Sequence, residues 1–171
     1  MDYKNFFGLA ESPFDITADP KFFFPSMQHT AAIKKILDSV ETSSNLTVMT
    51  GSVGLGKTFI MRKLLDDFSK RDNPPQAGII VLLHREVNAH WLLRAFAAQM
   101  ETGTEDADKD VLEASVKSKL SANSREKKQT IVIIDEAQML EDPEALIAFK
   151  GLLDLEVEGE KTLEAVLTGT P

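Results

Sequence analysis

Short apolar runs alternate with helical patterns along most of the chain. Mainly apolar runs cover residues 46–49, 78–83, 131–134 and 163–168, and the last of them leads into a polar ending. Short, nearly continuous apolar runs are typical of strands buried on both faces of a parallel sheet. Apolar residues at helical spacing cover 26–40, 59–68, 88–100 and 143–153, with a weaker pattern over 111–120. This alternation predicts an α/β fold with a mainly parallel sheet.

The first 25 residues differ from the rest because they are rich in aromatic and turn-forming residues. Phenylalanine stands at positions 6, 7, 14, 22, 23 and 24, and prolines at 13, 20 and 25 disfavour one continuous helix. We expect residues 1–25 to form an aromatic strap that packs on the core, and residues 26–171 to form the core domain. A flat apolar wall also suits a nucleotide base, so the strap has a functional interpretation beside the packing one.

A glycine-rich loop follows the first apolar run. Residues 51–58 match the pattern G-x-x-x-x-G-K-[ST], and strand, loop and helix arrive in the order that a phosphate-binding loop requires. The glycines let backbone N–H groups surround an anion, Lys57 places a charge near the β- and γ-phosphates, and Thr58 offers a hydroxyl to Mg²⁺. A chance glycine turn is the alternative that this context disfavours. The expected contacts to the nucleotide are Gly51, Ser52, Val53, Gly54, Leu55, Gly56, Lys57, Thr58 and Phe59.

Two acids end the third apolar run. Asp135 and Glu136 follow it directly, and the carboxyl ends of parallel strands meet where ligands bind. We expect Asp135 to hold Mg²⁺ through a water, because Mg²⁺ prefers carboxylates yet keeps much of its hydration shell. We expect Glu136 to orient and polarise the attacking water. Two acids at this place could also mark an acidic helix start, but the phosphate loop upstream favours the catalytic interpretation.

The charge and composition of the chain limit the classes of binding partner and the cellular location that we expect. The net charge of -8 over 171 residues argues against broad attraction to nucleic acid or anionic lipid. A local basic concentration comprises Lys117, Lys119, Arg125, Lys127 and Lys128, which fits a solvated face or, alternatively, contact with nucleic-acid phosphates. Without cysteine there is no disulfide or thiolate chemistry, and neither a signal-peptide pattern nor a membrane-length apolar run is found, so we expect a cytoplasmic location. We expect His29 to be an exposed helix residue rather than a metal ligand.

The motifs together resemble the AAA+ branch of P-loop ATPases. The resemblance rests on the loop of residues 51–58, on Asp135-Glu136-Ala137-Gln138 and on the ending Leu167-Thr168-Gly169-Thr170-Pro171. The stretches Phe6-Phe7-Gly8, Ser12-Pro13-Phe14 and Asp19-Pro20-Lys21-Phe22 are similar to the ExeA or general secretion pathway A family, whose relatives include TniB-type transposition ATPases. The likeness runs over nearly the whole chain.

The resemblance implies a P-loop NTPase three-layer sandwich of AAA+ type, with Walker A at residues 51–58 and Walker B ending in Asp135 and Glu136. It also implies that the fourth strand lies between the first and the third. That order would bring Thr168 or Thr170 beside the γ-phosphate in the role called sensor 1. Family members continue into a fifth strand and a helical lid with a sensor arginine, so we expect this chain to be an amino-terminal fragment without the lid.

The expected function is Mg²⁺-dependent binding and hydrolysis of ATP, with self-association as an AAA+ oligomer. In the secretion branch, hydrolysis would drive assembly or remodelling of a partner complex in a secretion or cell-envelope system. An ATP-dependent, DNA-binding regulator of transposition type is one alternative. A nucleotide-dependent interaction module that does not hydrolyse ATP is the other.

Overall fold

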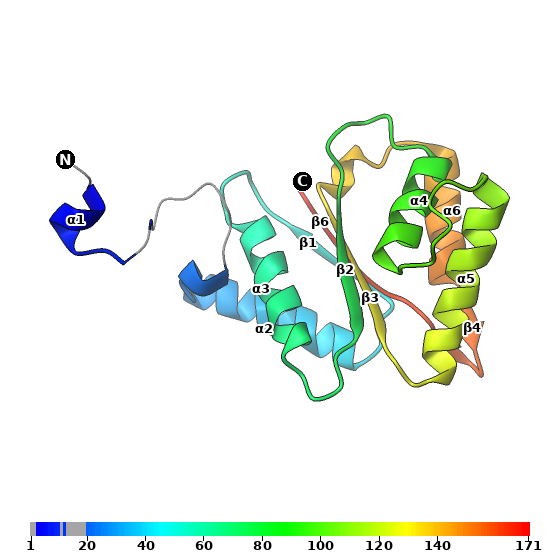
Figure 1. The fold of residues 1–171 in the computed structure, drawn as a ribbon, viewed down its shortest axis with the longest axis horizontal. Helices are drawn as coiled ribbons and strands as arrows, with labels where there is room; N and C mark the ends of the chain where they lie inside the picture. The colour runs from blue at the N-terminus through cyan, green and yellow to red at the C-terminus, as the bar shows by residue number, and fades with distance from the viewer. Residues whose placement is uncertain (1–2, 11, 13–19) are drawn as a thin grey trace.

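The fold is built on a four-stranded parallel sheet with the strand order β1-β6-β3-β2 (Figure 1). The computed structural model describes residues 3–10, 12 and 20–171. The strands are β1 (Leu46–Thr50), β2 (Gln76–Val81), β3 (Thr130–Asp135) and β6 (Glu164–Gly169). All neighbouring strands pair in parallel. The sheet order expected from the AAA+ resemblance is confirmed, because β6 lies between the strand before the glycine loop and the strand that ends in Asp135.

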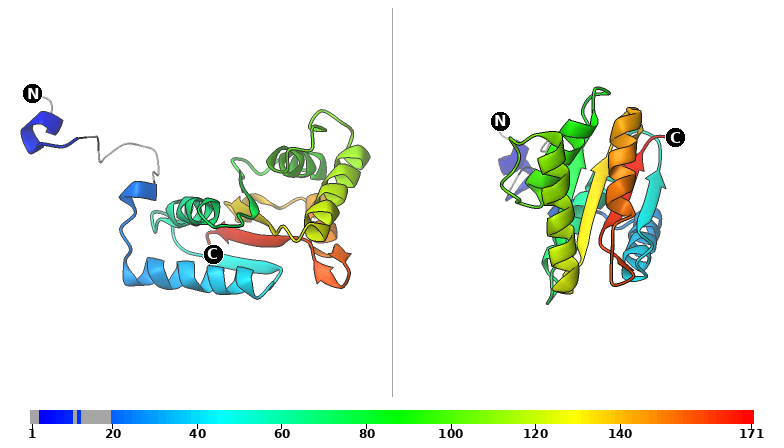
Figure 2. Two further views of the ribbon diagram at one scale, coloured as in Figure 1. Left: turned by 60° about the horizontal axis from the view of Figure 1, so that its bottom comes forward. Right: turned by 90° about the vertical axis from the view of Figure 1, so that its right-hand side faces the viewer.

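Helices cover both faces of this sheet (Figures 1 and 2). One layer contains α2 (Met27–Glu41) and α3 (Lys57–Ser69), and the other contains α4 (Ala89–Gln99), α5 (Lys109–Arg125) and α6 (Pro143–Leu153). Strand β3 shows how the sequence supports two layers: Ile131 and Ile133 belong to the core beneath α2 and α3, and Val132 and Ile134 to the other core. Every residue of β3 is buried as a result. The α/β fold with helices on both sides of a parallel sheet is therefore confirmed.

Side-chain caps begin three of these helices. Ser26 Oγ accepts from the backbone N–H of His29, Asn88 from that of Trp91, and Asp142 from that of Glu144. Such caps satisfy N–H groups that have no partner within the helix. Because each cap stands just before an apolar pattern, the starts of α2, α4 and α6 were readable from the sequence.

Two elements differ from the sequence-based expectation. The weak pattern over residues 111–120 is part of a longer helix, α5, whose 17 residues bury only Leu112, Val116, Leu120 and Asn123. Such a narrow apolar stripe gives a weak periodic signal. The short strands β4 (Glu156–Val157) and β5 (Glu160–Lys161) form an antiparallel hairpin between α6 and β6, where the apolar pattern predicts no element.

The amino-terminal strap packs on the core only in part. Among the described residues of this segment, Phe23 contacts the core under α2 and α3, just after the 3-10 turn η1 (Pro20–Phe22). Phe6 and Phe7, on the short helix α1 (Tyr3–Phe7), are 70% and 68% exposed, and Phe24 is 79% exposed. Phe14 lies outside the described residues. Packing by the strap is therefore observed at Phe23 and not at these three exposed rings.

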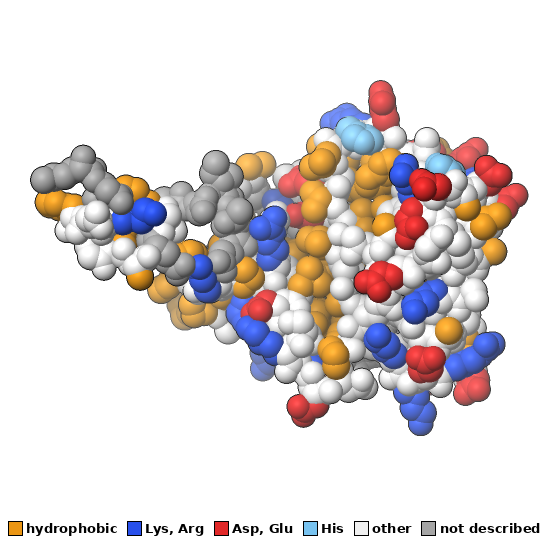
Figure 3. Space-filling view, viewed as in Figure 1, with side chains coloured by type: hydrophobic (Ala, Val, Ile, Leu, Met, Phe, Trp, Pro, Cys, Tyr) orange, Lys and Arg blue, Asp and Glu red, His pale blue; other side chains and the backbone are white. Residues whose placement is uncertain are grey.

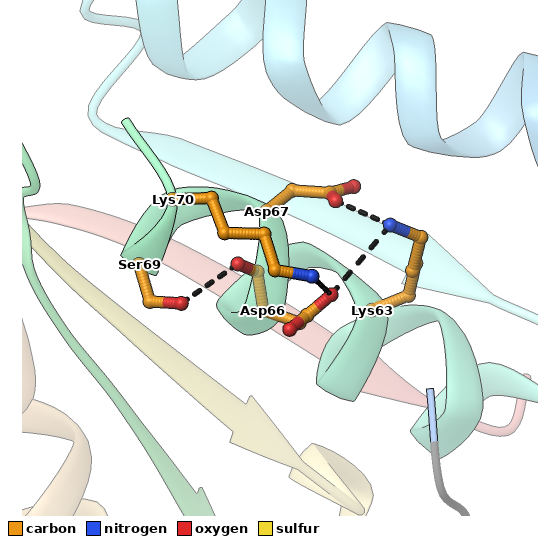
Figure 4. Close-up of polar contacts among 5 residues, drawn as sticks. All are labelled: Lys63, Asp66, Asp67, Ser69 and Lys70. Atoms are coloured by element: carbon orange, nitrogen blue, oxygen red, sulfur yellow. Dashed lines mark hydrogen bonds and ion pairs between the residues drawn. The ribbon is translucent and has the colours of Figure 1, made fainter. Parts of the chain in front are cut away.

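Charged side chains follow one side of α3 (Figure 4). Lys63 pairs with Asp66 and Asp67, and Lys70 Nζ lies 2.6 Å from Asp66 Oδ2. The hydrogen bond from Lys70 lowers the pKa of the Asp66 carboxyl. Ion pairs at this helical spacing between partly exposed side chains contribute little to stability.

The edge of the sheet at β2 is apolar rather than charged on the face that Figure 3 shows. Hydrophobic side chains form a band over β2, while acidic and basic side chains are interspersed over α4 and α5. Val81 is 38% exposed and Leu83, just after β2, is 82% exposed. Among the described residues, no helix combines the length and the apolar character needed to cross a bilayer.

Candidate nucleotide-binding site

The glycine loop leaves the sheet at the carboxyl end of β1. Gly51 N–H donates to the carbonyl of Gly169, 3.1 Å away, which extends the pairing of β1 with β6 by one step. Gly54 and Gly56 have φ angles of 84° and 79°, in the left-handed region that glycine adopts without strain. Helix α3 then begins at Lys57. The unpaired N–H groups of its first turn and the loop amides together form a site suited to an anion.

Lys57 is held inside this loop. Its side chain is largely buried, and Nζ donates to the carbonyl oxygens of Gly51 at 2.9 Å and Ser52 at 3.2 Å. Both acceptors are neutral. Phosphate oxygens would add the attraction of a negatively charged acceptor to the hydrogen bonds of the same ammonium group. Lys57 is therefore placed to bind an anion without leaving the loop.

Asp135 joins the two motifs. Its Oδ2 accepts from Thr58 Oγ1 at 2.5 Å, across a separation of 77 residues. Its Oδ1 accepts from the backbone N–H of Glu136 at 3.0 Å and from Thr168 Oγ1 at 3.3 Å, and the residue is 1% exposed. A hydroxyl and a carboxylate in direct contact are oxygen ligands that suit Mg²⁺. The donor set of Thr58 and Asp135 therefore fits the expected metal.

Glu136 stands directly after β3 with a φ of 58°, in the left-handed region that is uncommon for residues other than glycine. The short 3-10 turn η2 (Ala137–Met139) follows it. Within that turn, Gln138 Nε2 donates to Glu136 Oε2 at 2.5 Å, and Gln138 Oε1 accepts from the backbone N–H of Thr170 at 3.1 Å. Gln138 was part of the motif seen in the sequence but was not expected to be a site residue, because nothing in the linear pattern shows what its amide contacts.

The two threonines expected near the γ-phosphate have different surroundings. Thr168 is fully buried and its hydroxyl is directed to Asp135, whereas Thr170 follows β6 and uses its backbone N–H to bond Gln138. Both lie at the same end of the sheet as the loop. A contact from either to the γ-phosphate stays a prediction.

One side of the loop is covered by α2. His29 Nε2 lies 3.1 Å from the carbonyl oxygen of Leu55, so a proton on this nitrogen is donated to the loop. His29 is half-buried, which corrects the expectation of an exposed helix residue. His29 and Leu55 also line a cavity of about 190 Å³ beside Lys57. Sequence pattern could not reveal this role, because the contact depends on how α2 packs against the loop.

The outer part of the loop is open to solvent. Val53 and Leu55 are 87% and 56% exposed. Phe59, on the first turn of α3, stacks on Phe23 with the ring centroids 5.7 Å apart. The strap thus reaches the start of α3 through Phe23, although contact with a nucleotide base stays a prediction.

Comparison with known proteins agrees with this geometry. The model of a family described as AAA domain matches residues 40–171. The chain belongs to this AAA family of ATPase domains. It is also 32% identical over 170 residues to general secretion pathway protein A of Aeromonas hydrophila, which confirms the resemblance seen in the sequence. The alignment spans 99% of the chain but 30% of that relative, so the AAA domain corresponds to less than a third of its length.

Two solved structures from other organisms have a similar fold. The Walker-type ATPase PABY2304 of Pyrococcus abyssi aligns with a TM-score of 0.62 and 18% identity, over 92% of this chain and 49% of its own. The ORC2 protein of Aeropyrum pernix, solved in ADPNP-ADP complexes, aligns with a TM-score of 0.59 and 18% identity, over 84% and 40%. At this identity the likeness shows the shared fold.

Proposed function

We propose that this AAA domain binds ATP with Mg²⁺ at the loop of residues 51–58 and hydrolyses it. The contact between Thr58 and Asp135 carries the proposal, since it brings the phosphate loop and the acidic strand end together in one site. The complexes of the Aeropyrum pernix relative with ADPNP and ADP support an adenine nucleotide as the ligand.

The residues have separate tasks in this proposal. The loop amides and Lys57 bind the phosphates, and Thr58 and Asp135 hold the metal. When bound, Mg²⁺ neutralises developing charge on the phosphate oxygens. Glu136 accepts a proton from the attacking water and orients it. Positioning and charge stabilisation, rather than covalent chemistry by the protein, supply the catalysis.

We further propose that hydrolysis drives assembly or remodelling of a partner complex at the cytoplasmic side of a secretion or cell-envelope system, with the domain acting in an oligomer. The support is the similarity to general secretion pathway protein A. The DNA-binding alternative has weaker support. Arg125, Lys127 and Lys128 are exposed, but they lie before the amino end of β3, whereas Asp135 lies at its carboxyl end.

Phosphate release from Mg²⁺–ATP tests the hydrolytic role. The parent chain is compared with Glu136→Gln, and nucleotide affinity is measured beside turnover. Loss of a general base is expected to slow turnover by about a hundredfold or more while affinity changes little. Lys57→Ala is the matched control, because it should weaken nucleotide binding itself. A Glu136→Gln variant that turns over at the parent rate would contradict the role of Glu136, and a parent that binds ATP without releasing phosphate would favour the non-hydrolysing module.

A further inference from the structure

Gln138 uses both ends of its side-chain amide within the site. Its Nε2 donates to the Glu136 carboxylate at 2.5 Å, and its Oε1 accepts the Thr170 N–H at 3.1 Å. One side chain thereby connects the acid after β3 to the backbone after β6. Because these strands are neighbours in the sheet, the link closes a short bridge across the carboxyl end of the site.

Gly169 makes room for this bridge. A Cβ at this position would lie well under 3.0 Å from Gln138 Oε1, a separation that real Cβ atoms do not show. The φ of Gly169 is not in the left-handed region, and its backbone pairs with Thr50 in the sheet. Space for the Gln138 amide, rather than unusual backbone conformation, therefore requires the glycine.

The backbone of Glu136 is held independently of Gln138. Its N–H donates to Asp135 Oδ1 at 3.0 Å, and its carbonyl accepts from the N–H of Met139 at 2.9 Å. The remaining freedom of Glu136 is rotation of its side chain. Gln138 restricts that rotation by binding Oε2, which leaves Oε1 available to a water.

We propose that Gln138 is a positioning residue, which fixes the Glu136 carboxylate for water activation and ties its orientation to the backbone at Thr170. This inference rests on the proposed function, since it gives Glu136 the role of base. Loss of the amide lets the carboxylate rotate away from its productive orientation. The loss of this amide lowers turnover and leaves nucleotide binding unchanged, because the described hydrogen bonds of the Gln138 side chain go to Glu136 and Thr170 and not to the phosphate loop.

Gln138→Glu is the main test, because it preserves the shape and an acceptor for Thr170 while placing a like charge against Glu136. We expect kcat for ATP to fall by about tenfold or more, as the loss of a hydrogen bond to a charged group implies, with KM within about twofold. In a Glu136→Gln background, Gln138→Ala should cause no further fall, since the two residues act through one step.

Gly169→Ala provides a second route to the same defect, by displacing the amide without altering Gln138. Gly78→Ala is its matched control, because a Cβ at position 78 would also displace a glutamine side chain, that of Gln99, outside the nucleotide site. We expect Gly169→Ala to lower kcat and Gly78→Ala to leave it unchanged, with melting temperatures measured for both.

Hydrogen exchange tests the bridge without turnover. The Thr170 amide should exchange faster in Gln138→Ala than in the parent. Equal exchange, a parental kcat in Gln138→Glu, or an undiminished effect of Gln138→Ala in the Glu136→Gln background would overturn the inference. A parent that releases no phosphate would instead overturn the proposed function, and the positioning role with it.

Discussion

Replacing Gly54 by alanine isolates the conformational requirement of the phosphate loop. Gly54 has a φ of 84°, and a Cβ built on it meets no atom within 4 Å. The substitution therefore introduces no clash, and its whole effect is the strain of an L-residue in the left-handed region. That strain amounts to about 1–2 kcal/mol.

This cost should appear in nucleotide affinity. The chain can relieve the strain by letting the loop depart from its anion-binding conformation, and binding must then restore it. Since about 1.4 kcal/mol corresponds to tenfold in affinity, the Kd for Mg²⁺–ATP should rise by about fivefold to thirtyfold. Titration with a fluorescent ATP analogue measures this change.

Gly103→Ala is the matched control. Gly103 has a φ of 71°, its Cβ would also meet nothing within 4 Å, and it lies in the loop between α4 and α5. The same strain should lower its melting temperature by about 2–4 °C per kcal/mol without changing nucleotide affinity. Parental affinity in Gly54→Ala would refute the reasoning, and an equal loss of affinity in Gly103→Ala would show that the effect is one of global stability.

Two further predictions concern groups next to the sheet. Burial raises the pKa of the Glu164 carboxyl, and the hydrogen bond that this carboxyl accepts from the Asn45 N–H opposes the rise. The stability that the folded protein gains from the protonated carboxyl is therefore fully present below the unfolded pKa and is lost as pH rises through the folded pKa. Glu164→Gln should therefore raise the melting temperature at pH 7. It should not raise it at about pH 4, where the Glu164 carboxyl of the parent is already largely protonated even in the unfolded state. An equal rise at both pH values would contradict this cause. His29→Ala should weaken nucleotide binding by about threefold to tenfold through loss of its hydrogen bond to Leu55, measured by the same titration; unchanged affinity would show that His29 does not hold the loop.

The strands and helices were largely predictable because the pattern is local. The start of α3 follows from the glycine loop and the caps at Ser26, Asn88 and Asp142 mark other helices, since each signal lies within a few residues of the element that it begins. Helix α5 was underestimated because a narrow buried stripe gives little periodic contrast. The exposure of Phe6 could not be read from composition, because an aromatic side chain looks the same in sequence whether or not a partner surface covers it.

The sequence by itself determined the chemistry available to the site. The spacing of Gly54, Gly56 and Lys57 specifies an anion-binding loop, and Asp135 with Glu136 at a strand end supplies the acids. The contact of Thr58 with Asp135 across 77 residues, and the bridge from Gln138 past Gly169, were decided by the tertiary structure. The physical reason is that a linear pattern encodes which groups each segment carries, whereas the strand order and the space beside each side chain decide which of those groups touch.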